Sequence, residues 1–163
     1  VSRASAYRWM GGNDQVLAEV LRVRNRRRFQ DLGERHRGKI GADRVLAVLS
    51  DYARETAASA RFRKLILDDP VRVLEITASH NFPNQRDLIS LVQGLLEEEE
   101  RRGNLTSPVD AHTLAYSIVR LIEAFIFGDI VAGEKPDLDK CDAVLKLLVA
   151  GQEQPTKRRV RSV

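Results

Sequence analysis

Apolar residues recur every three or four positions along most of the chain, which is the spacing that buries one face of an α-helix. This pattern predicts helices over residues 2–10, 13–35, 42–60, 62–68, 71–79, 85–102, 109–132 and 138–149. Sustained alternation of apolar and polar residues, which marks a half-buried strand, is nearly absent. Glycine and proline fall where these helices are expected to end. The sequence therefore predicts an all-α fold.

The first two helices are expected to be separate, because the pair Gly11-Gly12 is typical of a helix stop. The long helix that follows, over 13–35, joins this short segment to the rest of the chain without a break. Its spacing predicts one inward apolar stripe, made of Val16, Leu17, Val20, Leu21, Val23 and Phe29.

The helix over 109–132 differs from the others because it has almost no polar face. A helix that is apolar nearly all round must be covered on two sides. At 1.5 Å per residue it is roughly 36 Å long, which is a large surface for one small domain to cover. A second subunit is therefore expected to cover part of it, although complete burial inside one subunit remains an alternative.

Positive charge is concentrated at the start of the chain, although the net charge of the whole chain is only +4. Residues 1–37 contain nine arginines and four acidic residues, and four more basic residues follow Glu153. Such a basic block indicates either a polyanionic partner or a solvated basic helix face. The acidic run over 97–100 is expected to be a solvated helix end.

Several functional classes lack their sequence signals. No apolar run reaches the roughly 18–20 residues of a membrane span, and the chain does not open with a signal peptide. The single cysteine, Cys141, excludes an internal disulfide and fits a reducing cytoplasm. The sequence has no metal-ligand spacing, no Gly-x-Ser-x-Gly motif and no His-x-x-x-His motif. We therefore expect no enzyme activity, no cofactor, no metal and no membrane association.

Residues 1–17 contain the most specific motif of the chain: small residues, two aromatic residues, a glycine pair and a new amphipathic helix. Small side chains such as Ser2 and Ser5 let a helix N-terminus approach DNA closely. Arg3 and Arg8 are long enough to reach base edges or phosphates, and the Tyr7 hydroxyl is a short phosphate donor. The motif suits reading of the major groove, and a helical hairpin that merely packs in this way is the alternative.

This motif resembles the second half of the helix-turn-helix of TetR-family transcriptional regulators. The usual form there is Val-Ser-x-x-(Ser/Thr)-Leu-Tyr-x-(His/aromatic)-Phe, followed by a turn and another helix. The matching residues are Val1, Ser2, Ser5, Tyr7 and Leu17, with Trp9 and Met10 as allowed variants. Gly12 and Asn13 depart from the family, which commonly has a serine cap and a phosphate-binding lysine there. The stretch Ser-Arg-Ala-Ser-Ala-Tyr-Arg-Trp-Met-Gly, residues 2–11, is also similar to the corresponding stretch of a narrower subgroup. That subgroup contains the actinobacterial regulators of acyl-homoserine-lactone (quorum-signal) degradation.

The resemblance implies a TetR-like regulatory helical bundle preceded by the second half of a helix-turn-helix domain. It divides the chain into a remnant of that DNA-binding domain over 1–12, a connecting helix over 13–36, a ligand-binding and dimerisation domain over 37–150 and a flexible basic tail over 151–163. The first two helices of the DNA-binding domain are expected to lie outside this sequence. The implied function is a cytoplasmic, ligand-responsive repressor that binds double-stranded operator DNA. The expected DNA contacts are Ser2, Arg3, Ser5, Tyr7, Arg8 and Trp9.

The resemblance also places an effector pocket between the middle helices. Aromatic walls with a few polar groups suit a small amphipathic or hydrophobic molecule, such as an acyl lactone or an acyl chain. We expect about half of the following candidates to contact the ligand: Tyr52, Phe62, Leu67, Ile76, Phe82, Leu88, Leu91, Tyr116, Arg120, Glu123 and Phe127. Arg120 and Glu123 are equally compatible with orienting a ligand head group and with an ion pair at a subunit interface.

The last two long helices are implied to pair with their copies as a four-helix bundle in a homodimer. The candidates for this interface are Ile118, Ile122, Phe125, Ile126, Leu138, Cys141, Leu145 and Leu148. Ligand binding is expected to move the long helix over 13–35 and so change the spacing of the two recognition helices. A helical dimeric adaptor without a small-molecule effector is the alternative function, which a closed and well-filled core would favour.

Overall fold

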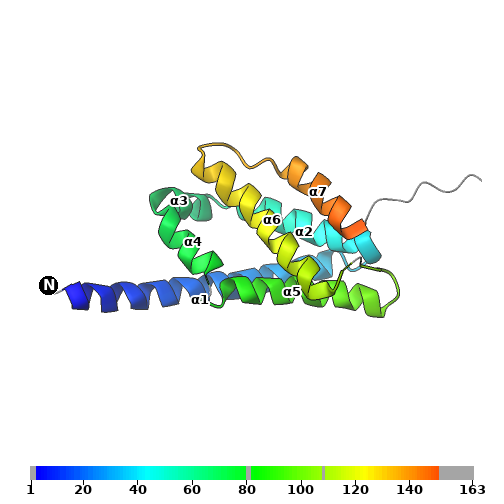
Figure 1. Cartoon of the computed structure of the whole chain (residues 1–163), viewed down its shortest axis with the longest axis horizontal. Helices are drawn as coiled ribbons and strands as arrows, with labels where there is room; N and C mark the ends of the chain where they lie inside the picture. Colours follow the sequence, from blue (N-terminus) through cyan, green and yellow to red (C-terminus); the bar gives the residue numbers. More distant parts are fainter. Residues whose placement is uncertain (1–2, 80–81, 108, 151–163) are drawn as a thin grey trace, which may run out of the picture.

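The chain is a bundle of helices in the computed structural model, which describes residues 3–79, 82–107 and 109–150 (Figure 1). In these residues the helices are α1 (Arg3–Arg35), α2 (Gly41–Ala57), α3 (Ala60–Asp68), α4 (Pro70–Ala78), α5 (Asn84–Arg101), α6 (Ala111–Val131) and α7 (Leu138–Ala150). The described part of the chain contains no strand. The prediction of an all-α fold is therefore confirmed.

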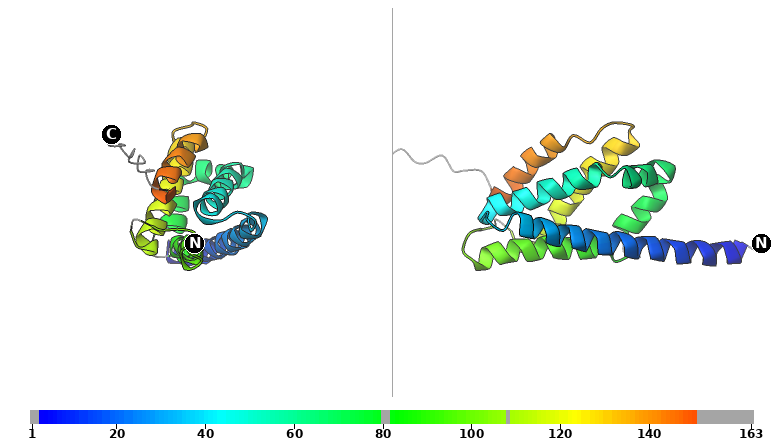
Figure 2. Two further views of the ribbon diagram at one scale, coloured as in Figure 1. Left: turned by 90° about the vertical axis from the view of Figure 1, so that its right-hand side faces the viewer. Right: turned by 180° about the vertical axis from the view of Figure 1, so that it is seen from behind.

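Helix α1 is the longest element, and the other helices pack along its C-terminal part (Figures 1 and 2). Helices α2 and α5 lie against it, α6 crosses α5, and α7 lies along α2 and α6. The N-terminal part of α1 extends beyond α4 and away from the bundle (Figure 2). Because α1 is a single helix, its projecting end continues without a break into the part that packs in the core.

The prediction of a helix stop at Gly11-Gly12 was wrong, because α1 continues through both glycines. Each glycine in a helix interior costs only about 1 kcal/mol relative to alanine. Helix formers such as Met10 and Gln15 lie on both sides of the pair, and α1 contains no proline. The glycines therefore weaken the helix at this point without ending it.

The inward stripe of α1 is only partly the one that the spacing predicted. Leu21 and Phe29 are buried as expected, and Ala18 and Leu32 are buried with them. Val16, Val20 and Val23 are between 53% and 64% exposed. At 100° per residue these three valines lie on the side of the helix opposite the buried residues, so they could not share one stripe with them.

Helices α3 and α4 form a short hairpin whose ends are fixed by capping. The Ser59 hydroxyl accepts a hydrogen bond from the Phe62 amide at 3.4 Å, and the Asp69 carboxylate accepts one from the Arg72 amide at 3.1 Å. Pro70 occupies the first turn of α4, where no amide donor is needed. Ile76 of this hairpin packs with Ala18 and Leu21 in a small cluster beside the main core. The hairpin thus contacts α1 next to the point where α1 leaves the bundle.

A buried carboxylate joins the start of α2 to the end of α5. Glu99 is fully buried and accepts hydrogen bonds from the Gly41 amide at 2.7 Å and from Arg44 at 2.6 Å. Burial alone would raise the pKa of Glu99, but the hydrogen bonds from Gly41, Arg44 and Asn104 outweigh it and hold this pKa below its ordinary value. The expectation that the whole acidic run over 97–100 is solvated was therefore wrong at Glu99.

Replacing Gly41 by alanine is expected to lower the free energy of unfolding by about 2 kcal/mol or more. Gly41 has a φ of +59°, and a Cβ there would lie 2.4 Å from the Asn104 carbonyl oxygen. The control is Gly94→Ala in α5, where a Cβ meets nothing within 4 Å and the free energy of unfolding should rise by up to about 1 kcal/mol. Urea unfolding followed by circular dichroism measures both. Equal midpoints for Gly41→Ala and the parent chain would contradict this account of the α2 start.

Candidate functional site

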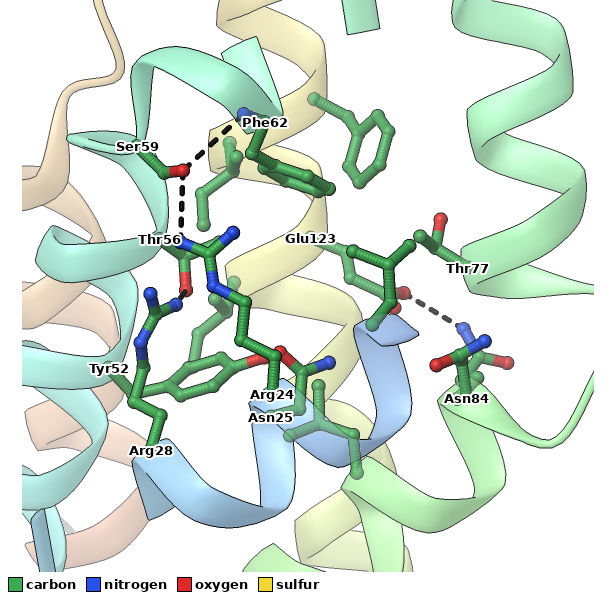
Figure 3. A pocket seen from close by; sticks show the side chains of 16 residues that line it. Arg24, Asn25, Arg28, Tyr52, Thr56, Ser59, Phe62, Thr77, Asn84 and Glu123 are labelled. Atoms are coloured by element: carbon green, nitrogen blue, oxygen red, sulfur yellow. Dashed lines mark hydrogen bonds between the residues drawn. The ribbon is translucent and has the colours of Figure 1, made fainter. Parts of the chain in front are cut away.

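A cavity opens between α1, α2, α3, α4, α5 and α6 (Figure 3). It holds about 640 Å³ of space, its open mouth included. The lining residues are Leu21, Arg24, Asn25, Arg28, Tyr52, Thr56, Ser59, Phe62, Thr77, Asn84, Gln85, Leu88, Ile122, Glu123, Ile126 and Phe127.

The apolar part of the wall comes mainly from α3 and α6. The rings of Phe62 and Phe127 meet edge to face, with centroids 5.8 Å apart. Ile122 and Ile126 lie one turn apart on α6 and are buried. This surface can take the apolar part of a ligand, since burying each methylene group stabilises a complex by about 0.8 kcal/mol.

The wall formed by α1 and α2 is cationic. Arg24 Nη2 donates to the Ser59 hydroxyl at 3.0 Å, and Arg28 Nη1 donates to the Thr56 hydroxyl at 2.8 Å. Burial lowers the pKa of Arg28, and the nearby charge of Arg24 lowers it further. An arginine remains a cation at neutral pH even so. This wall therefore presents fixed hydrogen-bond donors to the cavity.

Tyr52 adds a neutral hydroxyl to the cationic wall. Its ring packs on Phe29 with centroids 5.8 Å apart, and the side chain is almost completely buried. Burial raises the pKa of Tyr52 to about 12, although Arg28 opposes the shift. The hydroxyl thus keeps its proton over the physiological range and can either donate or accept a hydrogen bond.

Glu123 contributes the one acidic side chain of the lining. Its carboxyl group accepts a hydrogen bond from Gln85 Nε2 at 2.8 Å and lies 3.6 Å from Arg120 Nη1. Burial raises the pKa of Glu123 to about 7, against the opposing effects of Gln85 and Arg120. Near neutral pH the carboxyl group is therefore present in both its neutral and its charged form.

The pocket contains five of the residues that the sequence analysis proposed as ligand contacts, namely Tyr52, Phe62, Leu88, Glu123 and Phe127. The other six lie elsewhere. Leu67 and Tyr116 are 55% and 45% exposed on the outer surface. Ile76 and Phe82 belong to the small cluster beside α1, and Leu91 packs against the main core. Arg120 is outside the lining, with its guanidinium 5.3 Å from the centre of the Tyr116 ring.

The sequence analysis missed most of the polar lining. The missed polar residues are Arg24, Asn25, Arg28, Thr56, Ser59, Thr77, Asn84 and Gln85. The signal for Arg24 and Arg28 was their spacing, because they fall three and seven residues after the buried Leu21, which leaves Arg28 half-buried and Arg24 at the exposed edge of that side of α1. The basic character of this segment suggested an outward-facing surface instead.

Comparison with known proteins identifies the family and the fold of the chain. Residues 40–150 match the family described as tetracyclin repressor-like, C-terminal domain. The chain belongs to the TetR family of transcriptional regulators. The solved structure of the R. erythropolis transcriptional repressor QsdR, from the TetR family, has the same fold with a TM-score of 0.78 and 21% sequence identity. The alignment covers 95% of this chain and 81% of that one. None of the curated proteins matches the chain.

The family assignment confirms the resemblance that residues 1–17 indicated. For the expected DNA contacts of this TetR-family chain, the structure gives only the helical backbone of Arg3, Ser5, Tyr7, Arg8 and Trp9, at the projecting end of α1. Ser2 and the predicted basic tail over 151–163 lie outside the described residues.

The proposed dimer contacts of the TetR-family chain lie mostly in its own core. Ile118, Ile122, Ile126, Leu138, Cys141 and Leu145 are buried within one protomer, which leaves little of their surface for contact with a partner. Phe125 and Leu148 are partly buried and pack against the same core. The prediction chose the most apolar face of each helix, and that face points inward.

The outer face of α6 and α7 carries a second set of apolar side chains. Tyr116, Val131, Val144 and Leu147 are between 38% and 59% exposed. Ala124 and Gly128 lie between Tyr116 and Val131 on the outer side of α6 and are also exposed. These exposed apolar residues lie on two helices that contact each other, and we call them the α6–α7 face (Tyr116, Ala124, Val131, Val144 and Leu147).

The described residues include neither a membrane-spanning helix nor a cluster of metal ligands. None of the described helices combines the length and the apolar character that crossing a membrane requires. No group of three or more histidine, cysteine, aspartate or glutamate side chains in the described ranges is arranged to hold a metal ion.

The Glu123→Gln variant tests the electrostatics of the pocket through the pH dependence of stability. A carboxyl group whose pKa is raised from 4.5 to about 7 on folding holds its proton more tightly in the folded state. Its contribution to stability is therefore complete below pH 4.5 and is lost as the pH rises to about 7, by up to about 3 kcal/mol.

The quantity to measure is the difference in free energy of unfolding between the parent chain and Glu123→Gln from pH 4 to pH 8. As the pH rises, the glutamine variant should become more stable relative to the parent chain, because the glutamate ionises in its buried site and glutamine does not. A difference that is independent of pH would show that the carboxyl group titrates normally.

Proposed function

We propose that this TetR-family protein is a ligand-responsive transcriptional repressor, and that its effector is a small amphipathic molecule such as an acyl lactone or an acyl chain. The observation that carries the proposal is the cavity, with one apolar wall and one donor-rich wall. A well-filled core would instead favour a helical adaptor without an effector. As a DNA-binding regulator, the protein would act in the bacterial cytoplasm.

The two walls fit the two parts of an amphipathic effector. An acyl chain would lie against Phe62, Phe127 and Ile126, and a polar head group would face Arg24 and Arg28 (Figure 3). Carbonyl oxygens accept hydrogen bonds from guanidinium groups, and such charge-assisted bonds are worth about 1.5–3 kcal/mol each. The narrower sequence resemblance to regulators of acyl-homoserine-lactone degradation agrees with this class of ligand.

The effector would act on DNA through α1. Arg24, Asn25 and Arg28 belong both to the pocket and to the helix whose other end carries the proposed recognition residues. Ion pairs tie α1 to the neighbouring helices, with Arg72 of α4 2.6 Å from Asp14 and with Arg26 paired to Asp87 of α5. A ligand that contacts α1 in one position better than in another shifts the population toward that position.

A homodimer would convert this shift into a change of DNA affinity. Two recognition helices must be about 34 Å apart to enter successive major grooves. Movement of α1 in both protomers changes that spacing. We propose that the α6–α7 face forms the dimer interface, since its apolar side chains are exposed in one protomer.

Arg28→Met tests the role of the cationic wall in effector binding. The change removes the guanidinium but keeps most of the side-chain volume, so affinity for N-octanoyl-homoserine lactone should fall about tenfold or more. Arg27→Met is the matched control, since Arg27 is the exposed neighbour on the same helix. Calorimetric titration of the parent chain and both variants measures this.

Failure of the parent chain to bind any acyl lactone or acyl chain would contradict the proposed effector class. In the intact protein, saturation of the pocket without any change in operator affinity would contradict the proposed regulation.

Leu147→Glu tests the dimer. A carboxylate in the centre of an apolar interface is expected to shift the protein from dimer to monomer at micromolar concentration, because its desolvation is not compensated. Leu67→Glu is the control, since Leu67 is similarly exposed but lies on α3. Sedimentation equilibrium gives the masses. A parent chain that is monomeric under these conditions, or a Leu147→Glu variant that stays dimeric, would refute the interface.

A further inference from the structure

Glu123 and Arg120 lie three residues apart on α6, yet they belong to two different surfaces. Glu123 lines the cavity (Figure 3), and only 17% of its side chain is exposed. Arg120 is 42% exposed and does not line the cavity. Glu123 Oε2 and Arg120 Nη1 are 3.6 Å apart, so a single ion pair joins the pocket to the outer surface of α6.

Arg120 lies within the α6–α7 face. It is four residues after Tyr116 and four residues before Ala124, a spacing that places all three on the same side of the helix. From Tyr116 to Val131, Arg120 is the one charged residue among the exposed positions of α6. Its guanidinium is 5.3 Å from the centre of the Tyr116 ring, so it packs on an apolar residue of that face.

A dimer formed through the α6–α7 face would bury this cation. A buried guanidinium without a counter-charge destabilises an interface, because it loses hydration that nothing replaces. Among the described residues, Glu123 is the one acidic side chain within 4 Å of the Arg120 guanidinium. A negative charge on this residue of the pocket therefore stabilises the dimer.

The charge of Glu123 depends in turn on what fills the cavity. The other charged or titratable side chains of the lining are Arg24 and Arg28 of α1 and Tyr52 of α2, whereas α3, α4 and α5 contribute neutral groups. Both arginines donate to hydroxyl groups rather than to Glu123. Burial already raises the pKa of Glu123 to about 7. An uncharged ligand that displaces water from this carboxyl group removes more of its hydration and favours its neutral form.

We propose that the Arg120–Glu123 ion pair couples the pocket to the dimer interface, so that an uncharged ligand in the cavity weakens the dimer. The inference rests on the proposed function, because it needs both the effector pocket and the dimer through the α6–α7 face. Dimerisation favours the charged form of the Glu123 carboxyl group, and the ligand favours its neutral form. By thermodynamic linkage, the dimer binds the ligand more weakly than the monomer does, by the same factor.

The first measurement tests the ion pair without a ligand, by sedimentation equilibrium at about pH 8, where Glu123 is mostly charged. Glu123→Gln leaves Arg120 without a counter-charge, so the dimer dissociation constant should rise about fivefold or more above that of the parent chain. Arg120→Met removes the cation but keeps most of the side-chain volume. The double variant should therefore dimerise at least as tightly as the parent chain. A double variant as weak as Glu123→Gln would show that this change acts through the fold and not through Arg120.

The second measurement adds the ligand. Saturation of the parent chain with N-octanoyl-homoserine lactone, which is uncharged, should raise the dimer dissociation constant about fivefold or more. Arg120→Met is the matched control, because Arg120 does not line the cavity. This variant should bind the lactone, and its dimer dissociation constant should stay the same when the pocket is full.

The outcomes separate this inference from the function on which it rests. A parent dimer that binds the lactone and keeps its dissociation constant refutes the coupling but not the effector pocket. A Glu123→Gln variant that dimerises as tightly as the parent chain refutes the role of the ion pair. A monomeric parent chain, or one that binds neither the lactone nor octanoate, contradicts the proposed function itself, and the inference fails with it.

Discussion

The packing of one side of α1 determines both the stability of this chain and the position of its pocket. Phe29 and Leu32 are buried in the main core, and Leu21 is buried in the smaller cluster beside α4. The same side of the helix presents Arg24 and Arg28 to the cavity. A ligand in the cavity therefore contacts the helix that projects from the bundle, without any intermediate element. This shared surface is what makes the fold suitable for transmitting occupancy to the other end of α1.

The pocket retains groups that an ordinary core would exclude. Arg28 and Glu123 are both largely buried. Burial lowers the pKa of Arg28 and raises the pKa of Glu123, so it favours the neutral form of each group. Such groups reduce the stability of the ligand-free protein, since each loses hydration without full compensation. A ligand that pairs with them recovers this energy, which favours the bound state selectively.

The fold was predictable from the sequence because helical spacing and the positions of glycine and proline carry most of that information. The site was predictable only in part, since Tyr52, Phe62, Leu88, Glu123 and Phe127 were proposed and most of the polar lining was not. Phe62 and Phe127 are large apolar residues on helices that must pack together. Their spacing alone was therefore enough to predict them as ligand contacts. Arg24 and Arg28 lie among other arginines in a basic segment, and such a concentration of charge suggests a solvated surface. Only their register relative to Leu21 indicates that they reach the cavity.

The errors at Val20 and Ile118 have one physical cause. Hydrophobicity identifies which residues avoid water but not which protein surface covers them. Val20 is apolar but lies on the outer side of α1, and Ile118 is covered by its own protomer rather than by a partner. Gly11 and Gly12 illustrate a second limit, because a weak helix former ends a helix only when another structure competes for the segment.

Filling the pocket is expected to move α1. The most direct test places a spin label at residue 13, an exposed position near the projecting end of α1, and measures the distance between the two labels of a dimer by double electron–electron resonance. Saturation with N-octanoyl-homoserine lactone should shift this distance distribution by a few ångström. A distribution that stays the same while calorimetry shows the pocket to be full would contradict the account.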